Sequence, residues 1–164
     1  MSIAQAAFYI FVDNPFIWHA DWFWGLPLIV LTVLIHVSGL LFISQRVVHG
    51  SVGRMIERRH PKVAFVVVLA ATTLLATCLH GIEAGIWAFA YLFLGALPDL
   101  RSSMLYSLNA MTSYGHTNLN LEDHWRLMGA LEALNGWLLF GLTTAFLFAV
   151  IEKVWLLRSR SEDR

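Results

Sequence analysis

Cysteine and charged residues are scarce in this sequence of 164 residues. The lone cysteine, Cys78, lies in an apolar stretch, which excludes a disulfide within the chain and argues against a cysteine zinc framework. Only 13% of the residues are charged and the formal net charge is zero, so we expect no nucleic acid partner. No carboxylate pair and no Ser/His/Asp set is placed for hydrolysis, so we do not expect an enzyme.

Other signals are missing as well. The first 20 residues lack the basic segment of a secretory signal, so we expect the N-terminus to belong to the mature protein. No helix carries arginine at every third position, and no glycine-rich phosphate cradle occurs. The sequence therefore indicates neither a voltage sensor nor a nucleotide site.

Apolar residues are abundant instead. They make up 58% of the chain, and the mean hydropathy is +0.65. Three stretches are long enough to cross roughly 30 Å of hydrocarbon, at residues 24–46, 63–97 and 127–151. Each should be a helix, because lipid offers no partner for an unpaired backbone group. We predict one all-α membrane domain; the second stretch is long enough to require tilt or an extension beyond the bilayer.

The basic residues indicate the orientation. Nine of the eleven Lys and Arg residues fall in the loop 46–62 or after residue 151, and none falls in 1–23. Basic loops stay in the cytoplasm, so we predict the N-terminus outside and the C-terminus in the cytoplasm. The segment 1–23 should then be extracytoplasmic or interfacial, with Trp18, Trp22 and Trp24 at the lipid surface. The first span and its basic loop occupy 24–62, and the tail 154–164 is cytoplasmic.

The connection after the second span predicts a short helix. In LRSSMLYSLNAM, residues 100–111, a cap at Ser102 or Ser103 precedes apolar residues at near-helical spacing. About ten residues cannot span a bilayer, so this helix is either re-entrant or lies on the surface. The order of span, short helix, polar stretch and span is that of a pore loop.

A family resemblance supports this layout. Residues 79–153 resemble the pore module of tetrameric potassium channels, in particular small bacterial two-pore-domain-like proteins, and SLNAMTSYGHTN at 107–118 is similar to that family's S-L-x-x-x-T-T-V-G-Y-G-D. The resemblance implies a homotetrameric cation channel in a bacterial inner membrane, whose pore module is 63–153 and whose bound ions are K⁺ or Na⁺. It implies these ion-filter residues: Thr112, Ser113, Tyr114, Gly115, His116, Thr117 and Asn118.

The filter departs from the family pattern. Thr117 takes the place of the second glycine, where a β-branched residue at positive φ costs on the order of 1–3 kcal/mol. We therefore expect reduced potassium selectivity. A second register, which places Tyr114, Gly115 and His116 on Y-G-D, requires a two-residue deletion, and the gapless register is preferred. His116 can pack behind the filter, ring the axis as a metal ligand or titratable group, or belong to a closed plug.

Polar or small residues also occur inside two spans. The third span carries candidates for lining a cavity or for helix packing, and Glu132 is expected to be protonated, water-facing or partnered behind the filter. These candidates are Glu132, Asn135, Gly136, Leu139 and Thr143. In the second span His80 and Glu83 share one helical face, which His36 of the first span can approach.

The His/Glu group has two interpretations. It is either a hydrogen-bonded pair that joins helices or a divalent metal site. Two alternatives to a channel follow from these residues and the loop. One is a non-conducting accessory protein that holds a metal at His116 or at His36, His80 and Glu83. The other is a structural membrane subunit whose loop docks a partner.

Overall fold

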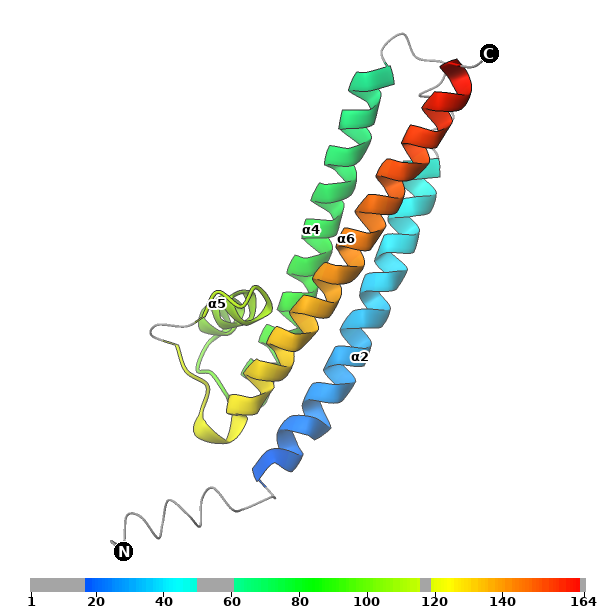
Figure 1. Cartoon of the computed structure of the whole chain (residues 1–164). Coiled ribbons are helices and arrows are strands. Elements are labelled where there is room, and N and C mark those ends of the chain that lie inside the picture. Colours follow the sequence, from blue (N-terminus) through cyan, green and yellow to red (C-terminus); the bar gives the residue numbers. More distant parts are fainter. Residues whose placement is uncertain (1–16, 50–60, 116–118, 163–164) are drawn as a thin grey trace, which may run out of the picture.

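The computed structural model describes residues 17–49, 61–115 and 119–162, which form helices and turns and contain no strand. Three long helices lie side by side (Figure 1). The elements are α2 (Ile17–Ile43), η1 (Ser44–His49), α4 (Pro61–Phe93), α5 (Leu100–Met111), η2 (Asp123–Trp125) and α6 (Arg126–Glu162).

The three long helices contain stretches that are long and apolar enough to cross a membrane: His19–Arg46, Phe65–Phe93 and Asp123–Lys153. This confirms the predicted all-α, multi-pass membrane architecture. Large apolar side chains cover the outside, as Phe93 (69% exposed) and Phe148 (67%) illustrate. Such a surface is expected where lipid tails or further copies, and not water, surround the protein.

Two helix ends differ from the approximate bounds predicted for the spans. Helix α2 already begins at Ile17, so the described end of the segment 1–23 is continuous with the first span. Helix α4 ends at Phe93 and not at residue 97. Gly95 has φ +68, a left-handed conformation that ends the helix and that glycine adopts without strain. Most of the basic loop, residues 50–60, lies outside the described residues.

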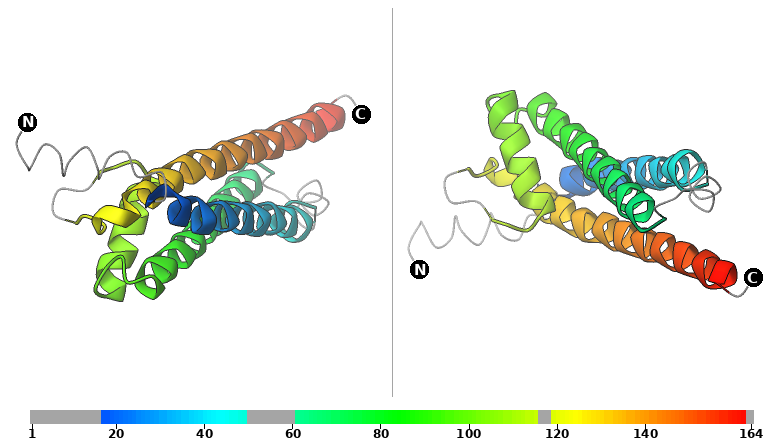
Figure 2. Two further views of the ribbon diagram at one scale, coloured as in Figure 1. Left: turned by 90° about the horizontal axis from the view of Figure 1, so that it is seen from below. Right: turned by 90° about the horizontal axis from the view of Figure 1, so that it is seen from above.

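Helix α5 has the predicted bounds and a different cap. The N-cap is Asp99, and the expectation of Ser102 or Ser103 was wrong: the Asp99 carboxylate accepts hydrogen bonds from the Ser102 amide (2.9 Å) and hydroxyl (2.7 Å). These bonds favour the ionised carboxylate and lower the pKa of Asp99. Figure 2 shows that α5 lies crosswise to the long helices.

The main core lies where α5 meets the long helices. Trp87 and Tyr91 of α4, and Met128 of α6, have no exposed surface, and the Tyr91 and Tyr106 rings pack edge to face with centroids 5.3 Å apart. A smaller cluster of Leu40, Ile43 and Leu79 joins α2 to α4 farther along the bundle. Aromatic packing thus holds the short helix against α4 and α6, which positions the loop that follows it.

Candidate functional site

The C-terminal end of α5 lies against the interior of α6. A Cβ atom added to Gly136 would meet the Met111 carbonyl oxygen at 2.1 Å, so the two backbones touch where only glycine fits. Gly136 lies ten residues after Arg126, the first residue of α6. At 1.5 Å per residue the contact is about 15 Å along that helix.

A second contact indicates a similar depth. The Ser107 hydroxyl of α5 donates to the backbone carbonyl of Ala84 at 2.7 Å. Ala84 lies nine residues before Phe93, the last residue of α4, or about 13–14 Å inside that helix. Both long helices therefore locate the second half of α5 well inside the length of the bundle.

The loop begins with a Schellman turn. The amide of Tyr114 donates to the Asn109 carbonyl (3.0 Å), and the amide of Ser113 donates to that of Ala110 (2.9 Å). Ser113 takes the left-handed position at φ +53, where a residue other than glycine is uncommon. The Thr112 hydroxyl donates to the Leu108 carbonyl at 2.7 Å, so its hydrogen bond is made to the backbone of α5.

Of the seven predicted filter residues, the structure describes Thr112, Ser113, Tyr114 and Gly115, and all four are exposed. Tyr114 is 85% exposed. Gly115, which the gapless register places on the first glycine of the family's filter, has φ +89. His116, Thr117 and Asn118 lie outside the described residues.

Trp137 of α6 supports the turn from the side. Its indole N–H donates to the Ser113 hydroxyl at 2.9 Å, while 66% of the side chain is exposed. This bond joins the strained residue of the loop to the α6 residue that follows Gly136. The exposed face of α6 beside the loop therefore carries an aromatic residue that the sequence analysis did not select.

Glu132 is fully buried and joins three helices. Its carboxyl group accepts a hydrogen bond from the Tyr91 hydroxyl of α4 at 2.6 Å and contacts the Ser107 hydroxyl of α5. Ser107 has one hydrogen, and the Ala84 carbonyl can only accept it. Every group in this series of hydrogen bonds has a partner when the Glu132 carboxyl group is protonated and donates its hydrogen to the Ser107 hydroxyl oxygen. A neutral, fully bonded carboxyl group is the form that a buried site favours.

The residues suggested as cavity lining do not face outward. Asn135 and Leu139 have no exposed surface, and Gly136 packs against Met111. The Asn135 amide donates to the Thr32 hydroxyl of α2 at 2.8 Å. A side chain buried within one chain cannot line a cavity between copies, so of the two interpretations, cavity lining and helix packing, burial supports helix packing.

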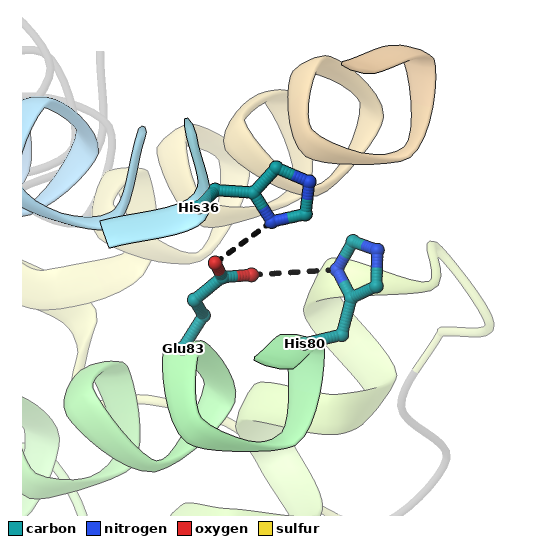
Figure 3. A group of neighbouring side chains, drawn as sticks. All are labelled: His36, His80 and Glu83. Carbon is teal, nitrogen blue, oxygen red and sulfur yellow. Dashed lines mark hydrogen bonds and ion pairs between the residues drawn. The ribbon is translucent and has the colours of Figure 1, made fainter. Parts of the chain in front are cut away.

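The fifth residue of that group, Thr143, is 9% exposed and belongs to a polar cluster between α2, α4 and α6. His36 Nδ1 lies 2.8 Å from Glu83 Oε1, and His80 Nδ1 lies 3.4 Å from Glu83 Oε2 (Figure 3). On the other side, Nε2 of each imidazole lies 3.0 Å from the Thr143 hydroxyl oxygen. The structure thus brings together the three residues that the sequence marked as a possible His/Glu group.

Three further polar contacts were not predicted. They are those of Ser107 and Tyr91 with Glu132, and that of Asp21 in α2, which is 1% exposed and accepts a hydrogen bond from the Met128 amide. Glu132, Tyr91 and Ser107 each carry a polar group on an otherwise apolar helical face. That signal marks them as buried, but only the fold pairs them.

Comparison with protein-family models, with curated proteins and with solved structures found no match to this chain.

Proposed function

We propose that this chain forms a cation-conducting pore as a homotetramer in a bacterial inner membrane, with its N-terminus outside and its C-terminus in the cytoplasm. The observation that supports the proposal is the position of the polar loop after α5. Its first residues follow Met111, which touches Gly136 about 15 Å inside α6. If α6 crosses the bilayer, the loop lies within the hydrocarbon region, which makes α5 a re-entrant helix.

Irregular backbone at that depth needs a special environment. Non-helical backbone within the hydrocarbon layer is tolerated only where protein buries it or where it lines a water-filled cavity. Residues 112–115 are exposed on the single chain, so α2, α4 and α6 do not supply that cover. Further copies arranged around a water path would supply it, and such a ring is the closed symmetry that most oligomers adopt.

The fourfold number rests on the resemblance of residues 107–118 to the filter segment of tetrameric potassium channels. In such a ring, backbone carbonyls replace the hydration shell of the ion. Glu132 and Ser107 would act behind the loop, where their contact holds α5 to α6. Trp137 would brace the turn through Ser113.

Ion choice follows from the departures in the loop. Thr117 stands where the family pattern has its second glycine, and Ser113 is held at positive φ without being glycine. Both features oppose a regular stack of carbonyl rings, because the backbone angles that such a stack requires are easiest for glycine. We therefore propose a weakly selective path for monovalent cations that passes both Na⁺ and K⁺.

Flux into liposomes tests the proposal. Purified full-length protein is reconstituted, its subunit number is measured by native mass spectrometry, and uptake of K⁺, Na⁺ and Ca²⁺ is compared. We expect four subunits, uptake of K⁺ and Na⁺ at similar rates and less uptake of Ca²⁺. The variant Thr117→Gly should raise the K⁺ to Na⁺ ratio. A tetramer without flux would identify a non-conducting subunit, and a monomer in the bilayer would end the proposal.

A further inference from the structure

We propose that His36, His80 and Glu83 hold one divalent transition-metal ion of the zinc class between α2, α4 and α6. The cluster belongs to the three long helices and has no contact with the α5 loop among the interactions described above. The inference therefore stands apart from the proposed pore, and a failure of either leaves the other intact.

The hydrogen atoms of the cluster leave one buried contact without a hydrogen. Three hydrogen bonds join His36 Nδ1 to Glu83 and the Nε2 atoms of both imidazoles to the Thr143 hydroxyl. Two neutral imidazoles and one hydroxyl supply three hydrogens, and these three bonds use all of them. His80 Nδ1 and Glu83 Oε2 then face each other at 3.4 Å as two lone pairs. A proton or a metal ion would join these two atoms.

One of the two contacts of Glu83 has the spacing of metal ligands, while the other, from Oε1 to His36 Nδ1 at 2.8 Å, is a hydrogen bond. Its Oε2 atom is buried and has no hydrogen-bond partner, although His80 Nδ1 lies 3.4 Å away. Ligand bonds of about 2.0–2.2 Å in a tetrahedral zinc site separate two ligand atoms by roughly 3.3–3.5 Å. The distance between Oε2 and Nδ1 is therefore too long for a good hydrogen bond and suited to two ligands of one ion. Ligand atoms of all three residues lie within 4.8 Å of one another.

Thr143 completes the arrangement from behind. When Nδ1 of both imidazoles binds metal, both Nε2 atoms carry hydrogen and need an acceptor. The Thr143 hydroxyl oxygen lies 3.0 Å from each of them and has two lone pairs to accept both bonds. Metal-binding histidines regularly donate their second N–H to such an acceptor, which orients the ring and fixes its tautomer.

The donor set selects the class of ion. Two imidazole nitrogens and one carboxylate oxygen are the ligands of zinc-type sites, and three protein ligands leave a fourth position for water. His36 and Glu83 have no exposed side-chain surface, whereas the His80 side chain is 27% exposed. An ion would therefore enter past His80.

Titration with Co²⁺ tests the proposal, because four-coordinate Co²⁺ absorbs visible light. Full-length protein in detergent is stripped with a chelator and titrated with Co²⁺, then with Zn²⁺. We expect one Co²⁺ per chain, a visible absorption band and its loss when Zn²⁺ displaces Co²⁺. Glu83→Gln and His80→Gln should weaken binding by more than about 100-fold, and Thr143→Val by about 10- to 100-fold, the range measured for outer-shell partners.

His124→Gln is the matched control, since His124 is exposed and its contacts are with Glu122 and Trp125, outside the cluster. It should bind Co²⁺ as the native protein does. Circular dichroism and subunit number verify that each variant is folded. Because the His80 side chain is partly exposed, His80→Gln is the variant least expected to disturb folding. Absence of the band in folded native protein would overturn the proposal and leave a proton as the occupant. An unchanged band in both Glu83→Gln and His80→Gln would overturn it as well.

Discussion

Asp21 of α2 and Met128 of α6 are joined by a hydrogen bond of 3.0 Å from the Met128 amide to the buried Asp21 carboxylate. Met128 lies in the first turn of α6, whose first four amides have no partner within the helix. Asp21 thus caps a helix that begins more than a hundred residues later in the chain. A carboxylate at a helix N-terminus also interacts favourably with the helix dipole.

Replacing Asp21 by Ala should lower the free energy of unfolding by about 0.5–2 kcal/mol, the usual loss for a helix cap. Asp21→Asn should lose less, because the amide oxygen can still accept the Met128 hydrogen. Thermal unfolding in detergent measures both. Glu122→Ala is the control, because it removes only the surface contact of 3.7 Å between the Glu122 carboxylate and His124 Nδ1. It should change the free energy of unfolding little. Equal stabilities for Asp21→Ala and the native protein would show that the cap contributes nothing.

Glu132 offers a test of its protonation state. Gln has the hydrogen-bonding pattern of a protonated carboxyl group: its oxygen can accept from Tyr91 and its NH₂ group can donate to Ser107. We therefore expect Glu132→Gln to cost less than about 1 kcal/mol of unfolding free energy. Glu132→Ala should cost about 2–5 kcal/mol, because it leaves a cavity and two buried hydroxyls that have lost a partner.

Chemical unfolding in detergent gives both values, and Tyr91→Phe combined with Glu132→Gln gives the coupling between the two residues. We expect a coupling of about 0.5–3 kcal/mol for groups in direct contact. A large loss of stability in Glu132→Gln alone would contradict a neutral carboxyl group and would indicate a charged one.

The helices were readable from the sequence because membrane spans and short polar-flanked helices have strong local signals. Runs of about 20 apolar residues predicted all three spans, and α5 was predicted at the bounds Leu100–Met111. The exact residues at which the helices begin and end were harder to predict. The cap of α5 is Asp99, and α4 stops before Gly95, since turn geometry and not hydropathy decides those positions.

Side-chain partners depended on how the helices pack. His80 and Glu83 could be placed on one face by their spacing, and only a choice of neighbouring helix brings His36 beside them. The spacing of Asn135 and Leu139 predicts that they share one face of α6, but it does not tell what that face packs against. The sequence therefore could not decide between a cavity and α2, where Asn135 donates to Thr32. The pairing of Trp137 with Ser113 had no local signal.

Trp137 should affect flux more than stability. Trp137→Phe removes the indole N–H that holds the Ser113 hydroxyl and keeps an aromatic ring on the same exposed face. One partly exposed hydrogen bond contributes about 0.5–1.5 kcal/mol, so the protein should still fold. We expect the K⁺ to Na⁺ flux ratio in liposomes to change by a few-fold, since the residue at positive φ loses its support.

Trp155→Phe is the control for that experiment, because Trp155 is 72% exposed on the same helix and lies far from the loop along α6. It should leave flux unchanged. Identical ion ratios in the native protein and in Trp137→Phe would mean that the turn at Ser113 does not contribute to the ion path.

Gly136 and Gly141 form a matched pair on α6. A Cβ atom at Gly136 would meet the backbone carbonyl of Met111 at 2.1 Å, whereas one at Gly141 would meet nothing within 4 Å. Alanine has a higher helix propensity than glycine, so each substitution stabilises α6 by up to about 1 kcal/mol. Any difference in stability between the two variants therefore comes from the contact with α5. Since backbone cannot move aside as a flexible side chain can, Gly136→Ala must displace the end of α5 and the loop.

We therefore expect Gly136→Ala to lower the flux of both K⁺ and Na⁺ by at least about tenfold and to lower the thermal stability, a typical result of overpacking worth about 1–3 kcal/mol. Gly141→Ala should keep native flux with equal or higher stability. The Co²⁺ site on the three long helices should persist in both variants, because neither glycine contacts it. Native flux in Gly136→Ala would mean that ions do not pass beside the loop that α5 positions against α6.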